Sequence, residues 1–312
     1  MEHISVLKTE AIEGLNIKSD GVYVDATLGL AGHSKEILGK LKRGFLFAFD
    51  QDMKAIEHSR LVLKDYENVE FIHSNFVNLK NELYSRGIKG VDGIIFDLGV
   101  SSPQIDDASR GFSFMADAEL DMRMDETNDF TAKNVVNEYS LDDLTEVFRK
   151  YGEEDFSRPI AKAIVASRPI NRTLELVDVI KSAVPTKYFN THHPERRIFQ
   201  AIRIEVNAEL RVLERVLPDA IDMLNPGGRI VVITFHSLED RITKQVFNKY
   251  SSIDDLVKGL PEIPEEYRPK LKLINKKPIL PSEDEINRNS RSKSAKLRVA
   301  ERIWEYEESK ES

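Results

Sequence analysis

Residues 91–125, VDGIIFDLGVSSPQIDDASRGFSFMADAELDMRMD, decide how this chain folds. The apolar run Val91–Phe96 predicts a buried strand, because strands of a parallel sheet are covered on both faces. Asp97 follows at its carboxyl end, and a loop rich in glycine, serine and acidic residues comes next. Ligands of open α/β sheets bind just beyond this end of the strands. The stretch therefore predicts the floor of an active site, although for Asp97 alone an ordered loop explains the pattern equally well.

Other apolar runs predict a mostly parallel, doubly wound sheet. Four further parallel strands are expected, at 21–26, 45–49, 69–72 and 229–235. Helices are expected between and after them, at 34–41, 52–64, 77–86, 198–224 and 240–249. A turn at 225–228 should precede the last parallel strand, and 271–274 should pair with 297–303 as a terminal antiparallel hairpin. Strands that alternate with helices indicate βαβ units, and a closing hairpin favours a methyltransferase sheet over a dehydrogenase sheet.

The connection after Gly99 is too long for a simple crossover. About ninety residues precede the helix at 198–224, where roughly a dozen would suffice. Helical patterns at 141–151, 159–166 and 173–183 fill this excess. We therefore expect one domain of residues 1–107 and 196–312, interrupted by a helical insertion domain of residues 108–195.

Composition narrows the class of protein. Of the 312 residues 41% are hydrophobic and none is cysteine, which excludes disulfides and thiolate zinc sites. The N-terminus has no apolar block for a signal peptide, and no apolar run approaches the roughly 18 residues of a membrane span. We expect a cytoplasmic protein that does not contact membranes. The net charge of −8 argues against uniform coating of nucleic acid and leaves room for local basic patches.

The first two strands end in acidic residues beside a loop of small residues. Residues 25–34 read DATLGLAGHS, which lacks the G-x-G-x-x-G pattern of pyrophosphate-binding turns. Asp25 could receive an ammonium group there, and Asp50 is placed to bind the two hydroxyls of a ribose. Phe76, after the third strand, could stack on adenine or belong to the core. A tight turn with two solvated acids is the simpler explanation, but a third acid at Asp97 favours a nucleoside cofactor.

Two segments with histidine remain ambiguous. His236 follows the fifth strand, where it could transfer a proton, contact a phosphate, or simply hydrogen-bond its loop. The acids and serine that follow it suit a helix cap. The segment 191–197, THHPERR, lacks the spacing of metal ligands, so no metal site is expected. Its arginines could face RNA or solvent.

Charge is distributed unevenly. Residues 106–129 hold eight acids and two arginines, a net charge of −6. Residues 155–172 hold four cations and one acid, and residues 285–303 hold six cations and two acids, net charges of +3 and +4. Basic clusters beside a cleft attract phosphates, although most such runs are solvated surface.

Together these motifs closely resemble the bacterial ribosomal RNA small subunit methyltransferase H family. The resemblance covers nearly the whole chain and rests on the following segments: His3 with Val6-Leu7, DATLGLAGHS, FAFDQD, residues 97–125, YGEEDFSRPIAKAI, RRIFQAIRIEVNAEL, PGGRIVVITFHSLEDR and NRNSRSKSAKLR. Members transfer a methyl group from S-adenosylmethionine to N4 of a cytidine in the decoding region of 16S ribosomal RNA. The resemblance implies a class I (Rossmann-like) methyltransferase domain whose helical insertion helps to bind RNA within the small ribosomal subunit.

The resemblance also implies the cofactor-binding residues, whereas the catalytic and RNA-binding candidates come from the strand ends and the basic segments. Cofactor binding falls on Ala31, Gly32, His33, Asp50, Phe76, Asp97 and Gln104, of which Gln104 comes from the resemblance alone. The candidate catalytic residues are Asp97 and His236. The candidate RNA-binding residues are Arg158, Lys162, Arg172, Arg196, Arg197, Lys293 and Arg298. A homodimer is kept as the candidate oligomeric state.

Several alternatives stay open at this point. Asp97 could polarise the cytosine amine, or it could bind the cofactor while backbone carbonyls near Val100–Pro103 hold the base, and the resemblance favours the cofactor role. Phe112 or Phe114 could stack on the target base once it has left its helix. A DNA amino-methyltransferase is the nearest rival, but the chain lacks the S/D-P-P-aromatic motif of that class. The glycine pattern disfavours an NAD-dependent oxidoreductase, and a non-catalytic RNA-binding protein would not need acids at three strand ends.

Overall fold

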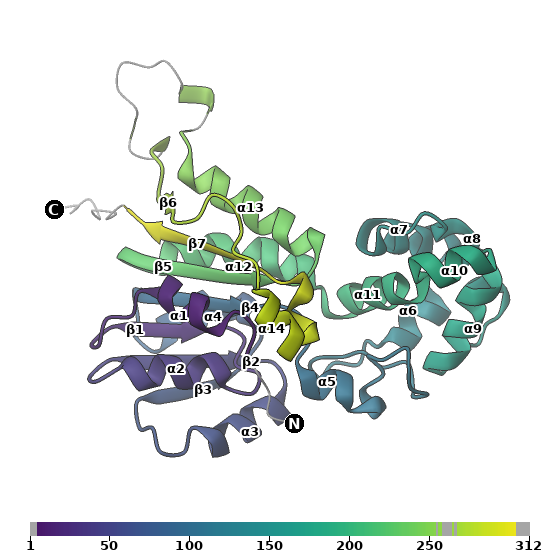
Figure 1. Cartoon of the computed structure of the whole chain (residues 1–312), viewed down its shortest axis with the longest axis horizontal. Coiled ribbons are helices and arrows are strands. Elements are labelled where there is room, and N and C mark those ends of the chain that lie inside the picture. Colours follow the sequence, from purple (N-terminus) through teal and green to yellow (C-terminus); the bar gives the residue numbers. More distant parts are fainter. Residues whose placement is uncertain (1–4, 254, 258–263, 265–266, 304–312) are drawn as a thin grey trace. The chain divides into compact units, whose positions relative to one another are not determined.

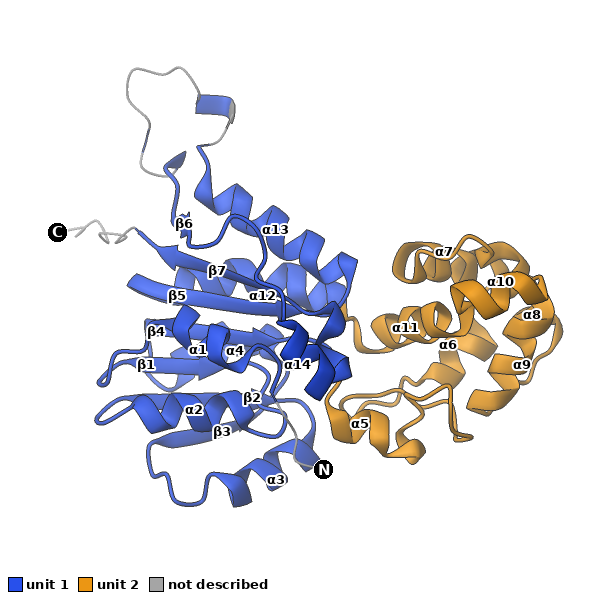
Figure 2. Cartoon of the chain, viewed as in Figure 1, with its two compact units in different colours: residues 1–99, 210–312 blue, residues 100–209 orange. Residues whose placement is uncertain are grey.

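The computed structural model describes residues 5–253, 255–257, 264 and 267–303, so His3 of the N-terminal motif lies outside the described residues. The chain forms two compact units (Figure 2). Unit 1 comprises Met1–Gly99 and Leu210–Ser312, and unit 2 comprises Val100–Glu209. The insertion therefore begins eight residues earlier, and ends fourteen residues later, than the boundaries that the sequence suggested.

Unit 1 contains a seven-stranded sheet in the order β3-β2-β1-β4-β5-β7-β6 (Figure 1). The strands are β1 (Val22–Asp25), β2 (Phe45–Asp50), β3 (Val69–His73), β4 (Val91–Asp97), β5 (Leu224–Thr234), β6 (Leu271–Leu273) and β7 (Lys296–Arg302). Strands β1 to β5 pair in parallel, whereas β7 is antiparallel to both β5 and β6. The predicted doubly wound α/β sheet with a closing hairpin is confirmed.

Helices precede, connect and follow the strands of unit 1, and α2, α3 and α4 are the crossovers of βαβ units. They are α1 (Lys8–Leu15), α2 (Gly32–Lys40), α3 (Met53–Val62), α4 (Leu79–Ser85), α12 (Glu209–Met223, whose first residue is in unit 2), α13 (Ser237–Ser251) and α14 (Glu283–Arg288). Helix α1 buries Ala11, Ile12 and Leu15, and it packs against α2 and against strands β4, β5 and β7. Burial of these side chains stabilises the unit by about 25 cal/mol for each Å² of apolar surface removed from water.

The glycine-rich turn at 225–228 lies inside β5 rather than before it. Val91 of β4 pairs with Leu224, and two residues later Gly93 pairs with Arg229. The four residues Asn225–Gly228 therefore oppose a single residue of β4 as an irregularity of the ladder. A sequence pattern of asparagine, proline and glycine indicates this local distortion but not its place in the register.

Unit 2 is helical. Its helices are α5 (Ser102–Asp106), α6 (Ala132–Glu138), α7 (Leu141–Gly152), α8 (Ser157–Ala166), α9 (Thr173–Ala183), α10 (Thr186–His192) and α11 (Pro194–Asn207). Helix α11 packs against α6, α7 and α9 and buries Ile198, Phe199, Ala201, Ile202 and Ile204. None of the helices in the described part of either unit has both the length and the apolar character that crossing a bilayer would need.

The single long helix predicted for 198–224 is wrong. Helix α11 ends at Asn207, α12 begins at Glu209, and Ala208 between them adopts φ +51°, in the left-handed region. The side chain of Asn207 leaves the helix surface to accept from the Met124 N–H at 2.8 Å and donate to the Met122 carbonyl at 2.8 Å. Apolar spacing continues across the break, so periodicity could not reveal it.

Glycine at position 208 should stabilise the protein, although glycine usually destabilises a helix. An alanine in the left-handed region destabilises the folded state by roughly 1–2 kcal/mol, and glycine avoids this cost. Glycine also makes the unfolded chain more flexible, which lowers stability by about 0.4–1 kcal/mol. We expect Ala208→Gly to raise the free energy of unfolding by about 0.5–1 kcal/mol in urea titrations. The control Ala163→Gly, inside α8, should lower it by about 1 kcal/mol. Equal destabilisation by both changes would show that Ala208 is helical in solution.

Candidate active site

Three carboxylates lie at the same edge of the sheet in unit 1. Asp25, Asp50 and Asp97 are the last residues of β1, β2 and β4. These strands are neighbours in the order β2-β1-β4, and parallel strands end at one edge. The sheet therefore gathers three acids that are far apart in the sequence.

Asp25 forms hydrogen bonds with the loop and the helix start that follow it. Its side chain is buried, with one oxygen accepting from the Ser34 hydroxyl at 2.7 Å and the other from the Thr27 N–H at 3.1 Å. Burial raises the pKa of Asp25 to about 6, which the two hydrogen bonds only partly oppose. Asp25 is only 1% exposed, which does not support the direct contact with an ammonium group that the sequence suggested.

Asp50 is half-buried and holds two backbone N–H groups. Its Oδ2 accepts from Gly29 and its Oδ1 from Asp52, both at 2.9 Å. Burial raises the pKa of Asp50 to about 6. Each carboxylate oxygen has a second lone pair, so two adjacent acceptors remain for a pair of vicinal hydroxyls.

The loop between β1 and α2 approaches the N-terminal segment closely. Ala31 is in the left-handed region at φ +63° and caps α2. A Cβ atom on Gly32 would lie 1.7 Å from the Ser5 hydroxyl, so a side chain at 32 would displace that residue. The small residues noted in the sequence therefore let Ser5–Leu7 support the loop from behind.

Asp97 faces His33 from the other side of the loop. The Asp97 N–H donates to the Thr27 hydroxyl at 2.6 Å, and its Oδ2 lies 3.5 Å from His33 Nδ1. Its Oδ1 is buried without a hydrogen-bond partner in the part of the chain that the structure describes. Burial, followed by the charges of Asp25 and Glu239, raises the pKa of Asp97 well above its usual range. A buried oxygen without a partner marks a place for a ligand donor.

Two further candidates have partners within unit 1. Phe76 is half-buried and meets Phe96 edge to face, with ring centroids 5.5 Å apart. Its contact with an adenine stays a prediction. His236 begins α13, where its Nδ1 accepts from the Glu239 N–H at 3.4 Å and its Nε2 lies 3.1 Å from Glu239 Oε1. The sequence placed a cap here, and His236 itself supplies it; its catalytic role stays a prediction.

The remaining ligand candidates lie in unit 2. Gln104 is buried and accepts from the Ser101 N–H at 3.0 Å as part of a capping box. Phe112 is buried, and Phe114 packs edge to face on Phe199 with centroids 5.8 Å apart. Both rings therefore have packing roles, and their stacking on a base stays a prediction, as does the contact of Gln104 with a cofactor.

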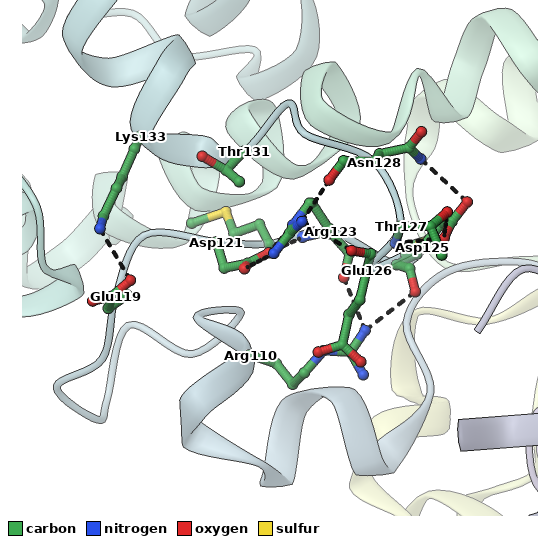
Figure 3. Close-up of polar contacts among 12 residues, drawn as sticks. Arg110, Glu119, Asp121, Arg123, Asp125, Glu126, Thr127, Asn128, Thr131 and Lys133 are labelled. Carbon is green, nitrogen blue, oxygen red and sulfur yellow. Dashed lines mark hydrogen bonds and ion pairs between the residues drawn. The ribbon is translucent and has the colours of Figure 1, made fainter. Parts of the chain in front are cut away.

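Arginine side chains organise the acidic stretch at 106–129 (Figure 3). Arg123 pairs with both oxygens of Asp121, at 2.9 and 2.7 Å, and donates to the carbonyls of Glu126 and Asn128. Arg110 is buried and donates to the carbonyls of Arg123 and Met124 at 2.9 and 3.2 Å. The sequence motifs did not single out these two arginines, although their isolation among eight acids was a usable signal.

The basic residues of unit 2 are mostly paired. Arg158 contacts Asp142 at 2.9 Å and Arg172 contacts Asp117 at 2.6 Å, yet both side chains are exposed. Arg197 lies 3.6 Å from the buried Glu154, whereas Lys162 and Arg196 are exposed. Exposed ion pairs are worth little, so these cations can exchange an acid for a phosphate at small cost.

In unit 1, Arg298 is already paired with an acid. Its side chain is 8% exposed and donates to Asp240 Oδ1 at 2.7 Å. Its contact with RNA stays a prediction, which this burial does not support. Lys293 is exposed and keeps its candidate role.

Comparison with known proteins decides the family. The family model described as the MraW methylase family matches residues 1–303. The chain belongs to this family. Ribosomal RNA small subunit methyltransferase H of Exiguobacterium sibiricum is 53% identical over 309 residues, which cover 97% of this chain and 99% of that protein.

Solved structures resemble the chain more distantly. An rRNA methylase from Streptococcus thermophilus has 12% identity and a TM-score of 0.45, over 97% of this chain and 100% of that one. TrmN from Thermus thermophilus has 11% identity and a TM-score of 0.43, over 95% of this chain and 48% of that one. Likenesses at this level carry no information about the site.

The methyl donor of a methylase in this family is S-adenosylmethionine. The residues present fit this molecule. Asp50 offers two acceptors for the ribose hydroxyls, and the sheet edge holds buried carboxyl groups that a sulfonium and an ammonium group would stabilise in their charged form. The free Oδ1 of Asp97 gives this edge an acceptor that no described residue of the protein uses.

The cofactor affinity should rise with pH and depend on Asp50. The pKa of Asp50 is raised to about 6, so its carboxyl is mostly protonated at pH 5 and ionised at pH 8. We expect Asp50→Ala to weaken calorimetric binding of S-adenosylmethionine by about 1.5–3 kcal/mol at pH 8, where charged hydrogen bonds are removed, and by about 1 kcal/mol at pH 5. Asp65→Ala, an exposed acid, is the control. Unchanged affinity in a folded Asp50→Ala variant would remove Asp50 from the site.

Proposed function

We propose that the protein methylates N4 of a cytidine in the decoding region of 16S ribosomal RNA, using S-adenosylmethionine, and that it acts in the cytoplasm on the small ribosomal subunit. The observation that carries the proposal is the carboxyl group of Asp97. It ends the central strand β4, next to the strand β1 that ends in Asp25, and among the described residues its buried Oδ1 has no hydrogen-bond partner. Family membership supports the choice of an rRNA substrate.

The cytosine amine is a poor nucleophile because its lone pair is delocalised into the ring. When bound, S-adenosylmethionine supplies an electrophilic methyl group on a sulfonium. The protein must hold the amine in line with that group and accept hydrogen bonds from its N–H groups, which raises its electron density. Asp97 Oδ1 is the acceptor that the site offers, with backbone carbonyls of Val100–Pro103 as further candidates.

The residues proposed for cofactor binding divide by chemistry. Asp50 binds the ribose hydroxyls, Phe76 lies against the adenine, and the backbone of Ala31–His33 lies along the amino-acid part. Gln104 completes the set by resemblance to the family. The His33 side chain is 5% exposed and already contacts Val6 and Asp97, so its part in the site runs through Asp97.

Unit 2 is proposed to bind the RNA. The exposed side chains of Arg158, Lys162, Arg172 and Arg196 and the partly exposed side chain of Arg197 supply cations, and Lys293 adds one from unit 1. Phosphate contacts of this kind give affinity without sequence preference, so the choice of cytidine must come from the site itself. The candidate homodimer stays a prediction.

The function is tested by mapping the product. The protein is incubated with labelled S-adenosylmethionine and either naked 16S rRNA or small subunits from a strain without the enzyme, and the modified nucleoside is then identified. N4-methylcytidine at one position of the decoding region is the expected result. Label in DNA alone would favour a DNA amino-methyltransferase, and no cofactor binding by calorimetry would favour a non-catalytic RNA-binding protein.

Charge reversal in unit 2 should separate RNA binding from cofactor binding. Changing Arg158, Lys162 and Arg172 together to glutamate should weaken RNA binding about 10–100-fold near 0.1 M salt. The slope of log affinity against log salt should become shallower by about 0.7–0.9 for each phosphate that the variant no longer neutralises. Affinity for S-adenosylmethionine should not change.

The matched control reverses three exposed lysines of unit 1, Lys40, Lys42 and Lys64, and so makes the same change in net charge. If both triple variants bind RNA equally weakly, the effect belongs to net charge and unit 2 holds no specific phosphate surface. Wild-type affinity and salt slope in the unit 2 variant would lead to the same conclusion.

A further inference from the structure

A chain of buried contacts connects Asp97 to the N-terminal segment of unit 1. Asp97 Oδ2 lies 3.5 Å from His33 Nδ1, and His33 Nε2 lies 3.2 Å from the Val6 carbonyl oxygen. The His33 side chain is 5% exposed. Leu7, next to Val6, is held in turn by its N–H, which donates to Glu285 of α14 at 2.7 Å. Both ring nitrogens of His33 are therefore engaged inside the protein.

The partners of His33 determine where its protons lie. A backbone carbonyl can only accept a hydrogen bond, so the contact with Val6 requires a proton on Nε2. A neutral ring with its proton on Nε2 would then present a bare lone pair at Nδ1 to the carboxylate of Asp97, which is unfavourable. The pair is satisfied when one proton lies between Nδ1 and Oδ2, as an imidazolium facing a carboxylate or as a neutral ring facing a carboxylic acid.

The charged groups near Asp97 determine how the proton on His33 affects the ionisation of its carboxyl group. Among the described residues, the acids Asp25 and Glu239 oppose the ionisation of Asp97, and His33 lies where a protonated ring would favour it. The Asp97 N–H donates to the Thr27 hydroxyl, so Thr27 leaves the carboxylate oxygens to other partners. Within the described protein, His33 is thus the side chain placed to help keep Asp97 charged, in addition to the cationic groups of a bound cofactor, while Oδ1 remains available.

We propose that Asp97 Oδ1 accepts the proton that the cytosine amine releases, and that His33 is the positioning residue that holds Oδ2 and keeps the carboxylate ionised. This inference rests on the proposed function. The bond between N4 and the methyl carbon forms as the bond between carbon and sulfur breaks, and the electron pair of that bond stays on sulfur. The methylated nitrogen then carries one excess proton. That proton passes to Asp97 Oδ1, the imidazolium keeps its own two protons, and the proton on Asp97 returns to solvent after the product leaves.

Two substitutions of His33 separate its two contacts. Glutamine places its amide near the position of Nε2, so His33→Gln can keep the hydrogen bond to Val6 but removes the partner of Asp97. Asparagine places its amide near Nδ1, so His33→Asn can still donate to Asp97 but removes the hydrogen bond to Val6. A purely structural role in supporting the N-terminal segment would make His33→Asn the more damaging change.

The test measures single-turnover methyl transfer to RNA from pH 5.5 to 9.5, with S-adenosylmethionine saturating for each variant by calorimetry. For His33→Gln we expect the rise of the rate with pH to move about 1–3 units to higher pH, with at least about a tenfold loss at pH 7 that is recovered at high pH. His33→Asn should move the profile much less. A profile of His33→Gln that superimposes on the wild type overturns the inference.

A second measurement does not depend on activity. Nitrogen NMR of the free wild-type protein with labelled histidine should show Nε2 of His33 protonated throughout, and Asp97→Asn should change the titration of the His33 ring. A ring protonated on Nδ1 alone overturns the inference, even if the variants fail to fold. Wild-type protein that binds cofactor but never methylates RNA defeats the proposed function and this inference together, whereas an unshifted His33→Gln profile in active protein defeats the inference alone.

Discussion

The gathering of three carboxyl groups, one buried and two half-buried, at one edge of a parallel sheet is the constraint on which the rest of the site depends. Asp25, Asp50 and Asp97 end neighbouring strands, so the topology itself brings them together. Burial raises the pKa of each of them. A site of this kind favours a cationic ligand, because the ligand's charge offsets what burial costs the carboxylates. S-adenosylmethionine carries a sulfonium and an ammonium group, and it meets this requirement.

The loops around the acids are arranged to hold them without filling the site. Asp50 takes N–H groups from Gly29 and Asp52, and Asp25 takes the hydroxyl of Ser34 and the N–H of Thr27. The second layer comes from the ends of the chain. Residues 5–7 lie behind the loop, and Glu285 fixes Leu7 from 278 residues away. These contacts thereby hold the loop that carries the candidate site residues Ala31, Gly32 and His33.

Unit 2 shows why local charge is a weak guide to function. Part of the acidic stretch at 106–129 is neutralised by cations that the fold brings to it, with Arg123 pairing with Asp121, Lys133 with Glu119 and Arg172 with Asp117. The same contacts take up part of the basic stretch at 155–172. The net charge of each segment was counted by itself, although the fold brings acids of one segment into contact with cations of another. Exposure, which a count of charges does not contain, decides which cations remain for RNA.

Sequence alone determined the chain order of the seven strands, the parallel sheet with its antiparallel hairpin, and the acids at strand ends, because the apolar pattern of each strand is a local property of the sequence. The family motifs, most of them long, also identified the methyl donor from residues alone. Tertiary structure decided the rest. Ala208 breaks a helix whose apolar spacing is continuous, because the side chain of Asn207 is needed by the loop at Met122–Met124. Arg298 is buried against Asp240, and His33 joins Asp97 to Val6. The sequence could not predict these contacts, because they link residues 27 to 64 positions apart and no spacing rule predicts such pairs.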